Sequence, residues 1–219
     1  MDVEGSARRL ANYLDSLPDF TVAKTIDGNY GHMGATITDG ILQAGINYES
    51  VVRPRVNRLR AEYPEAVTTS GFLTLIERVG LEEIIEWKPG AKPERILGVT
   101  RFFQKEGIET EGGLREWLEH KNNRKRFLKL NGIGEKTADY FGILVGVPAA
   151  AIDRHLIDFL RRAGIEVQGY TEAKQIIEAA ADLLGIHRSF LDHSIWRYIS
   201  SGKKMDKKST RTCPQTVTT

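Results

Sequence analysis

Lys136 and Asp153 are the two residues whose types and positions suit covalent chemistry. Lys136 follows a short connector, residues 130–135, and lies in the first turn of the helix that we expect after it. The dipole of that helix disfavours a positive charge at this end, which favours the neutral amine that a nucleophile requires. Such an amine can attack a carbon that bears a leaving group, and the C1′ carbon of a nucleotide sugar is one such carbon.

Asp153 follows the apolar stretch 147–152 and precedes another expected helix, for which it is a good N-cap. A carboxylate at a helix N-terminus is stable as an anion. It can stabilise the positive charge that develops on a sugar losing its base, and it can help to deprotonate the amine. Two alternatives stay open: Lys136 binds phosphate as a simple cation, and Asp153 only caps its helix.

The connector before Lys136 has the composition of a phosphate-binding turn. Gly132 and Gly134 flank Ile133, so the backbone can turn tightly and present free N–H groups at the start of a helix. Residues 120–129 read HKNNRKRFLK, with five Lys or Arg and no acidic residue. Together these features suit contact with a nucleic-acid backbone. Taken alone, two glycines are also typical of an ordinary interhelical turn. A basic run alone is also typical of a solvated helix face.

The elements that must position these residues are helices. Apolar residues recur with helical period along the chain, and we find no strand-like alternation, so we expect an all-α fold of about ten helices joined by short loops. Ser6 and Thr171 are expected to cap two of them. The expected ranges are 6–17, 35–44, 48–63, 71–79, 81–87, 93–106, 113–120, 122–128, 135–146, 154–164, 171–184 and 189–200.

Composition narrows the class of protein. The chain has 219 residues, of which 41% are hydrophobic and 27% charged, which is enough for a real core and argues against wholesale disorder. No apolar run is long enough to span a bilayer, and the first residues lack the apolar stretch of a signal peptide, so we expect a cytoplasmic protein. Cys213 is the one cysteine, which excludes an internal disulfide and a cysteine-ligated iron–sulfur cluster.

The segment 130–138, followed by Ile152-Asp-Arg-His155, resembles the helix-hairpin-helix–Gly/Pro–Asp superfamily of DNA glycosylases, of the endonuclease III and 8-oxoguanine glycosylase type. The resemblance extends over about residues 35–201. It implies two helical lobes with a cleft between them: residues 1–34 with 150–201, and residues 35–149 carrying the hairpin. The tail, residues 202–219, is expected to be disordered. Many relatives carry an iron–sulfur cluster, which this chain is expected to lack, and the hairpin proline of the family is Asn131 here.

The resemblance also implies roles for individual residues. Lys136 matches the nucleophile of the bifunctional members, and Asp153 matches the aspartate that assists it. A sodium or potassium ion is expected on the backbone carbonyls of Leu128, Leu130 and Ile133. The residues expected to contact DNA are Gly132, Ile133, Gly134, Thr137, Lys129, Arg126 and His155.

The lesion pocket is less sharply defined by the sequence. The resemblance expects a polar wedge residue within 43–48, and Asn47 is the first candidate, with Ile46 and Tyr48 behind it. Asp192 and Trp196 are four positions apart and therefore share a helix face, where a carboxylate and an aromatic ring would suit a base. The alternative is that Ile46, Tyr48 and Trp196 are core residues and that Asp192 caps a helix or pairs with an arginine.

The function implied is that of a monomeric bifunctional DNA glycosylase and abasic-site lyase acting on duplex DNA, with an oxidised base as the expected lesion. No cofactor is expected to be required. One alternative is a monofunctional glycosylase for mismatched or alkylated bases, in which Lys136 only holds phosphate. The other is a DNA-binding module without chemistry, which would need neither Lys136 nor Asp153.

Overall fold

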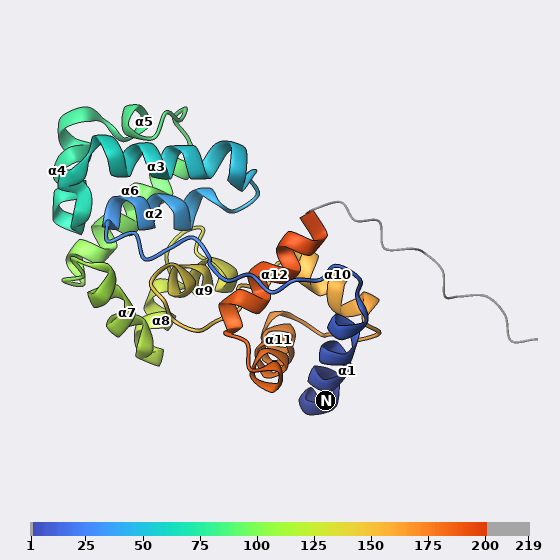
Figure 1. Ribbon diagram of the computed structural model, residues 1–219. Helices are drawn as coiled ribbons and strands as arrows, with labels where there is room; N and C mark the ends of the chain where they lie inside the picture. Colours follow the sequence, from blue (N-terminus) through green and yellow to red (C-terminus); the bar gives the residue numbers. More distant parts are fainter. Residues whose placement is uncertain (1, 201–219) are drawn as a thin grey trace, which may run out of the picture.

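The computed structural model describes residues 2–200, and within that range the chain is helical with no β-strand, so the predicted all-α class is confirmed (Figure 1). A π-helical turn, η1 (Tyr48–Val52), precedes the third helix, and a 3-10 turn, η2 (Pro64–Val67), follows it. The helices in chain order are α1 (Val3–Ser16), α2 (Met33–Leu42), α3 (Arg53–Glu62), α4 (Thr69–Val79), α5 (Leu81–Ile84), α6 (Ala91–Lys105), α7 (Glu111–Glu119), α8 (Lys121–Phe127), α9 (Glu135–Leu144), α10 (Arg154–Arg162), α11 (Tyr170–Leu184) and α12 (Arg188–Ser200).

Local side-chain chemistry sets the helix starts. Asp2 accepts a hydrogen bond from the Gly5 amide at 2.8 Å, so α1 begins at Val3, and the prediction that Ser6 caps it is wrong. Thr171 does not cap α11 either, because that helix begins one residue earlier, after a glycine. Asp153 caps α10 as predicted. The predicted disordered tail and Cys213 lie outside the described residues.

The buried apolar side chains form two large clusters. One is built from residues between Met33 and Val145, with Phe103, Phe127 and Phe141 in mutual ring contact. The other joins α1 to α10, α11 and α12, so the two ends of the described chain share one core (Figure 1). The lobe boundaries expected at residues 34 and 149 stay a prediction. Among the described residues, no helix is both long and apolar enough to cross a membrane.

α2 lies at the centre of the first cluster. All ten of its residues are buried, and it packs against α3, α6 and α9. Gly40 faces the ring of Phe141 on α9, so closely that a Cβ built at this glycine would overlap the ring. The absence of a side chain at this position therefore sets how near α2 and α9 approach, and α9 is the helix that carries Lys136.

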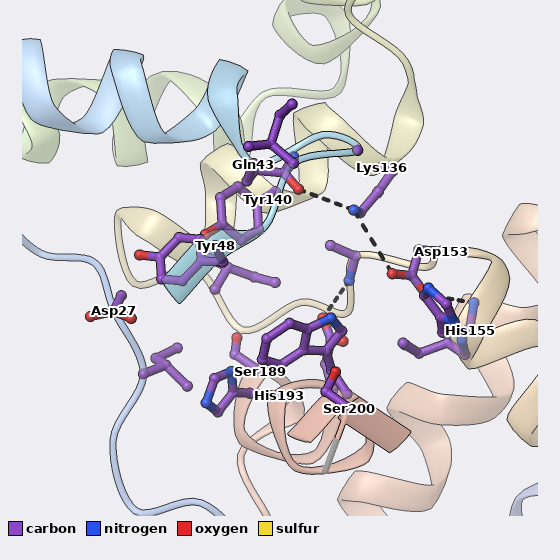
Figure 2. A pocket seen from close by; sticks show the side chains of 18 of the residues that line it. Asp27, Gln43, Tyr48, Lys136, Tyr140, Asp153, His155, Ser189, His193 and Ser200 are labelled. Atoms are coloured by element: carbon purple, nitrogen blue, oxygen red, sulfur yellow. Dashed lines mark hydrogen bonds and ion pairs between the residues drawn. The ribbon is translucent and has the colours of Figure 1, made fainter. Parts of the chain in front are cut away.

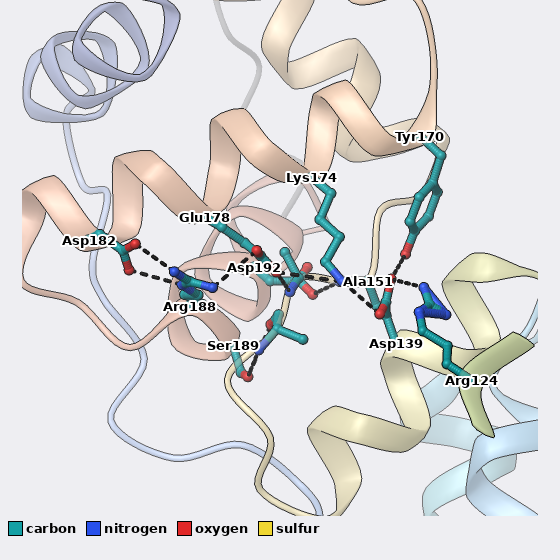
Figure 3. Close-up of polar contacts among 12 residues, drawn as sticks. Arg124, Asp139, Ala151, Tyr170, Lys174, Glu178, Asp182, Arg188, Ser189 and Asp192 are labelled. Carbon is teal, nitrogen blue, oxygen red and sulfur yellow. Dashed lines mark hydrogen bonds and ion pairs between the residues drawn. The ribbon is translucent and has the colours of Figure 1, made fainter. Parts of the chain in front are cut away.

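A buried carboxylate ties α9 to α8 and α11. Asp139 accepts hydrogen bonds from Arg124 at 3.0 Å, Tyr170 at 2.6 Å and Lys174 at 2.7 Å (Figure 3). Two cations and a hydroxyl satisfy its oxygens, which makes burial of this charge tolerable. Burial, together with the nearby Asp139 charge, raises the pKa of Tyr170, so its hydroxyl stays a donor. Asp139 follows Lys136 by three positions in α9, so the network holds α9 within one turn of Lys136.

We expect Gly40→Ala to destabilise the protein by about 1–3 kcal/mol, because the ring of Phe141 is fully buried and cannot move aside. Gly98→Ala, in the exposed part of α6, is the matched control: a Cβ there meets no atom, and we expect a gain of about 0.5–1 kcal/mol from helix propensity. Urea unfolding of both variants measures the difference. Equal effects of the two substitutions would show that Gly40 has no packing role.

Candidate active site

A cavity of about 550 Å³ lies between α9 and the segment after α2 on one side and α10 and α12 on the other (Figure 2). Its walls come from residues 26–27, 43–49, 151–156 and side chains of α9 and α12. Lys136, Asp153, Asp192 and Trp196 all line it. Residues that are far apart in the sequence and were singled out for chemistry are thus brought to one place.

Lys136 and Asp153 face each other across this cavity. The distance from Lys136 Nζ to Asp153 Oδ2 is 4.0 Å, and Nζ also donates to Gln43 Oε1 at 3.0 Å (Figure 2). The other oxygen of Asp153, Oδ1, accepts from the amides of His155 at 2.8 Å and Leu156 at 3.0 Å. One carboxylate oxygen therefore caps α10 and the other is directed at the amine. The two alternatives for Asp153, cap or partner of Lys136, are both realised.

The backbone before Asp153 is held by side chains from α11 and α12. The amide of Ala149 donates to Ser189 at 3.4 Å, that of Ala150 to Glu178 at 3.1 Å, and that of Ala151 to Asp192 at 2.8 Å (Figure 3). Three consecutive amides thus have side-chain acceptors in place of the backbone partners of a helix or sheet. This anchoring sets where Asp153 enters the cavity.

A second buried carboxylate stands behind the opposite wall. Asp39 accepts hydrogen bonds from the hydroxyls of Tyr30 at 2.6 Å, Tyr48 at 3.1 Å and Tyr140 at 3.2 Å. Burial raises the pKa of Asp39 to about 6, while these bonds act in the opposite direction. Burial and the Asp39 charge raise the pKa of all three tyrosines. Tyr48 and Tyr140 line the cavity, so Asp39 holds two of its aromatic walls by their hydroxyls.

The α12 wall contains both residues that the sequence singled out there. Asp192 is buried and accepts from the Ala151 amide, so it neither caps its helix nor pairs with an arginine. Burial raises the pKa of Asp192 to about 7. Trp196 stacks on His193 with ring centroids 5.9 Å apart, and burial lowers the pKa of His193. Trp196 is partly exposed in the cavity and is therefore not a core residue.

The candidates for the wedge also line the cavity. Asn47 is exposed, and its side-chain oxygen accepts from the Ser50 amide at 3.0 Å, which leaves its NH₂ group as a donor. Ile46 is partly buried, and the hydroxyl of Tyr48 is directed to Asp39. Which residue fills the gap left by a flipped base stays a prediction. Gln43, which contacts Lys136, was not singled out from the sequence, although it lies in the stretch considered.

The connector forms the tight turn expected between α8 and α9. Gly132 has φ +79°, in the left-handed region, and Gly134 precedes α9. The side chains of Ile133 and Thr137 are buried, so only their backbone groups can meet a ligand. The Leu130 carbonyl accepts from the Ile133 amide at 3.1 Å. The cation expected on the carbonyls of Leu128, Leu130 and Ile133 stays a prediction.

The basic run contributes fewer unpaired charges than its sequence suggests. Arg124 binds Asp139, and Arg126 forms an ion pair with Glu106. Lys129 remains exposed beside the connector, and His155 lies at the first turn of α10, lining the cavity. Among residues 2–200, no group of three or more His, Cys, Asp or Glu side chains is arranged to hold a metal ion.

Comparison with known proteins adds three findings. Residues 8–200 match the model of a family described as "Domain of unknown function (DUF8548)". An "8-oxoguanine DNA glycosylase/AP lyase" of Saccharolobus islandicus is 36% identical over 83 residues, and one of Saccharolobus solfataricus is 39% identical over 85 residues; each match covers 33% of this chain. The chain spans 40% of the length of these curated relatives.

The third finding concerns the fold. The chain resembles the crystal structure of H. pylori 3-methyladenine DNA glycosylase bound to 1,N6-ethenoadenine, with a TM-score of 0.62 at 17% sequence identity. The match covers 94% of this chain and 100% of that one. At this level of identity, the likeness establishes a shared helical fold.

We expect Asp153→Ala to cost about 1 kcal/mol of stability and Asp153→Asn only a few tenths, because asparagine keeps an oxygen that can cap α10. The 4.0 Å separation makes the ion pair with Lys136 a small contributor. Chemical unfolding of both variants tests this. Equal losses for alanine and asparagine would mean that the charge and not the cap stabilises this end of α10.

The pH dependence of stability should change in Asp192→Asn. Because the folded protein keeps the Asp192 proton up to about pH 7, while the unfolded chain loses it near its ordinary pKa of 3.8, this group lowers stability as pH rises through that window. Asparagine keeps an acceptor for the Ala151 amide without the charge. We expect the variant to gain up to about 4 kcal/mol relative to wild type between pH 4 and pH 8. A difference that does not vary with pH, measured by urea unfolding, would contradict this.

Proposed function

We propose that this chain, which belongs to the family described as "Domain of unknown function (DUF8548)" and to the helix-hairpin-helix–Gly/Pro–Asp superfamily of DNA glycosylases, is a bifunctional DNA glycosylase and abasic-site lyase. The observation that carries the proposal is the placement of Lys136 and Asp153 in one cavity, with the amine 4.0 Å from the free carboxylate oxygen. A module that only bound DNA would need neither group.

The comparisons support the same activity from another direction. The relatives from the two Saccharolobus species are named for both base excision and the lyase step. The structural neighbour is named as a DNA glycosylase. Because the matched relatives are covered over 40% of their length, the assignment to this chain rests on its own site residues.

In the proposed reaction, Lys136 is the nucleophile and Asp153 is the base that serves it. The neutral amine of Lys136 attacks C1′, and the bond from C1′ to the base breaks, so that the base leaves with the electron pair and takes up a proton. Asp153 accepts the proton that the new ammonium loses, and its charge stabilises the positive sugar. The sugar ring opens as O4′ gains a proton, which gives a Schiff base.

Strand cleavage then follows from the Schiff base. Loss of a proton from C2′ and breakage of the C3′–O bond expel the 3′ phosphate, and water hydrolyses the imine to return Lys136 to its amine form. The aromatic residues Tyr48, Tyr140 and Trp196 provide surfaces for an extruded base. Duplex DNA would be held at its phosphates by the turn at Gly132 and Gly134, with Lys129 beside it.

An oxidised base is the substrate class that we propose, in line with the names of the Saccharolobus relatives. The structural neighbour, whose title names 3-methyladenine and a bound ethenoadenine, favours an alkylated base as second candidate, released without strand nicking. A panel of duplexes with single oxidised or alkylated bases separates the two, because one candidate nicks the strand and the other leaves an abasic site intact.

We expect borohydride to trap wild-type protein covalently on a duplex that contains an abasic site or the preferred lesion. Lys136→Gln should abolish the adduct, and Asp153→Asn should slow its formation by about 10²–10⁴-fold. Lys105→Gln, which changes an exposed lysine in the last turn of α6, is the matched control and should trap like wild type. An undiminished adduct in Lys136→Gln, or none in wild type, would remove the assignment.

A further inference from the structure

Two lysines reach the C-terminal end of α2 from the first turns of other helices. Lys92 is the second residue of α6, and Lys136 is the second residue of α9. Lys92 Nζ donates to the carbonyl oxygens of Ile41 at 2.6 Å and Ala44 at 2.9 Å. Lys136 Nζ donates to the side-chain carbonyl of Gln43 at 3.0 Å. Lys92 therefore meets the negative end of the α2 dipole, and Lys136 contacts the side chain of the residue that follows the helix.

Lys92 is placed where its own helix does not favour it. A positive charge in the first turn of α6 opposes that helix dipole, and the side chain is half-buried. Burial, followed by the charges of Arg95 and Lys136, lowers the pKa of Lys92 to about 8. What stabilises the group is the set of carbonyl oxygens at the end of α2, which have no amide partners further along that helix.

Gln43 connects this contact to the cavity. It lies in the chain between Leu42 and Ala44, whose carbonyl oxygens both accept from Lys92. Its Oε1 accepts from Lys136, while its buried Nε2 has no hydrogen-bond partner among the described residues. Among the described residues, Lys136 is thus the hydrogen-bond partner of the Gln43 side-chain amide. Lys92 holds the backbone carbonyls of the residues before and after Gln43.

The contact with Gln43 bears on where the reactive electron pair of Lys136 points. A neutral amine has two N–H bonds and one lone pair. Gln43 Oε1 accepts from Lys136 Nζ at 3.0 Å, and Asp153 Oδ2 lies 4.0 Å from the same nitrogen (Figure 2). Because one N–H is directed to Gln43, the lone pair takes another direction. Gln43 therefore helps to decide the direction of attack.

We propose that Lys92 is a positioning residue for Lys136: by holding the end of α2 it keeps Gln43 in place, and Gln43 orients the Lys136 amine for attack. The inference rests on the proposed function, since it concerns the same nucleophile. Lys92 touches neither DNA nor the reacting atoms in this scheme. Its removal changes the rate of Schiff-base formation and leaves DNA binding in place.

The test compares single-turnover borohydride trapping of the full-length protein on an abasic duplex. Lys92→Met removes the amine and keeps the stem, Lys92→Arg keeps a cation with several donors, and Lys105→Met alters an exposed lysine of the same helix as matched control. Affinity is measured separately, by anisotropy on a duplex with a tetrahydrofuran abasic analogue. Thermal melting of each variant reports on folding.

We expect Lys92→Met to trap about 10- to 100-fold more slowly than wild type, with affinity changed by less than about twofold. Lys92→Arg should keep the rate within about threefold of wild type, and Lys105→Met should be unchanged. Wild-type trapping in Lys92→Met overturns the inference. A slower trapping rate that is accompanied by a lower melting temperature and a weaker DNA affinity also overturns it, because Lys92 would then have only a structural role. Absence of any adduct with wild type removes the proposed function and the inference together.

A second substitution tests the route through Gln43. Gln43→Met removes the acceptor for Lys136 and leaves the backbone carbonyls that bind Lys92. It should slow trapping as much as Lys92→Met does, and the double variant should be no slower than Gln43→Met alone, because both changes remove one interaction. Independent, multiplying losses in the double variant would overturn the route even if Lys92→Met is slow.

Discussion

The burial of α2 is the constraint on which the rest of the structure depends. This helix has no exposed face, so the polar groups that it carries depend on partners inside the protein, and the hydroxyl of Thr38 has none among the described residues. Asp39 meets three tyrosine hydroxyls, and the carbonyl oxygens at its end meet Lys92. Those partners form or support walls of the cavity. The side chains that satisfy the polar groups of the buried helix therefore also build or support the candidate active site.

Local rules account for what the sequence predicted well. Helical period gave the all-α class, and the position of Lys136 at the start of a helix and of Asp153 as an N-cap followed from residue types near them in the chain. The superfamily resemblance is confirmed by the comparisons. The distance between Lys136 and Asp153 could not be predicted from the sequence. It depends on how residues 149–151, which precede Asp153, are held by side chains of α11 and α12.

Long-range pairing accounts for what the sequence did not predict. Gln43 and Lys92 acquire their partners from segments distant in the chain, as Asp39 does in the case of Tyr140, and no local pattern marks them. The same cause reduces the number of unpaired charges in the basic run, since Arg124 and Arg126 pair with Asp139 and Glu106 from other segments. Two features of the sequence could have drawn attention to Asp39 and Lys92. Asp39 is a charge within an otherwise uncharged helix, and Lys92 is a positive charge at the start of one.

The two buried carboxylates at the cavity, Asp192 in one wall and Asp39 behind the other, have different hydrogen-bond partners. Asp39 is satisfied by neutral hydroxyls, and Asp192 by one backbone amide. Burial raises the pKa of both, which means that the folded state carries an electrostatic cost near neutral pH. The protein is thus less stable than it would be with apolar side chains at positions 39 and 192. These positions lie at the cavity, where polar groups can meet a ligand.

The anchoring of residues 149–151 bears on the order in which the protein is made. The amides that set the entry of Asp153 are held by side chains of α11 and α12, and α12 is the last helix of the described chain. A ribosome delivers the buried α2 and Lys136 well before these acceptors emerge. The nucleophile is therefore synthesised before the side chains that fix its carboxylate partner, so a growing chain does not carry an assembled reactive centre until α11 and α12 have been made.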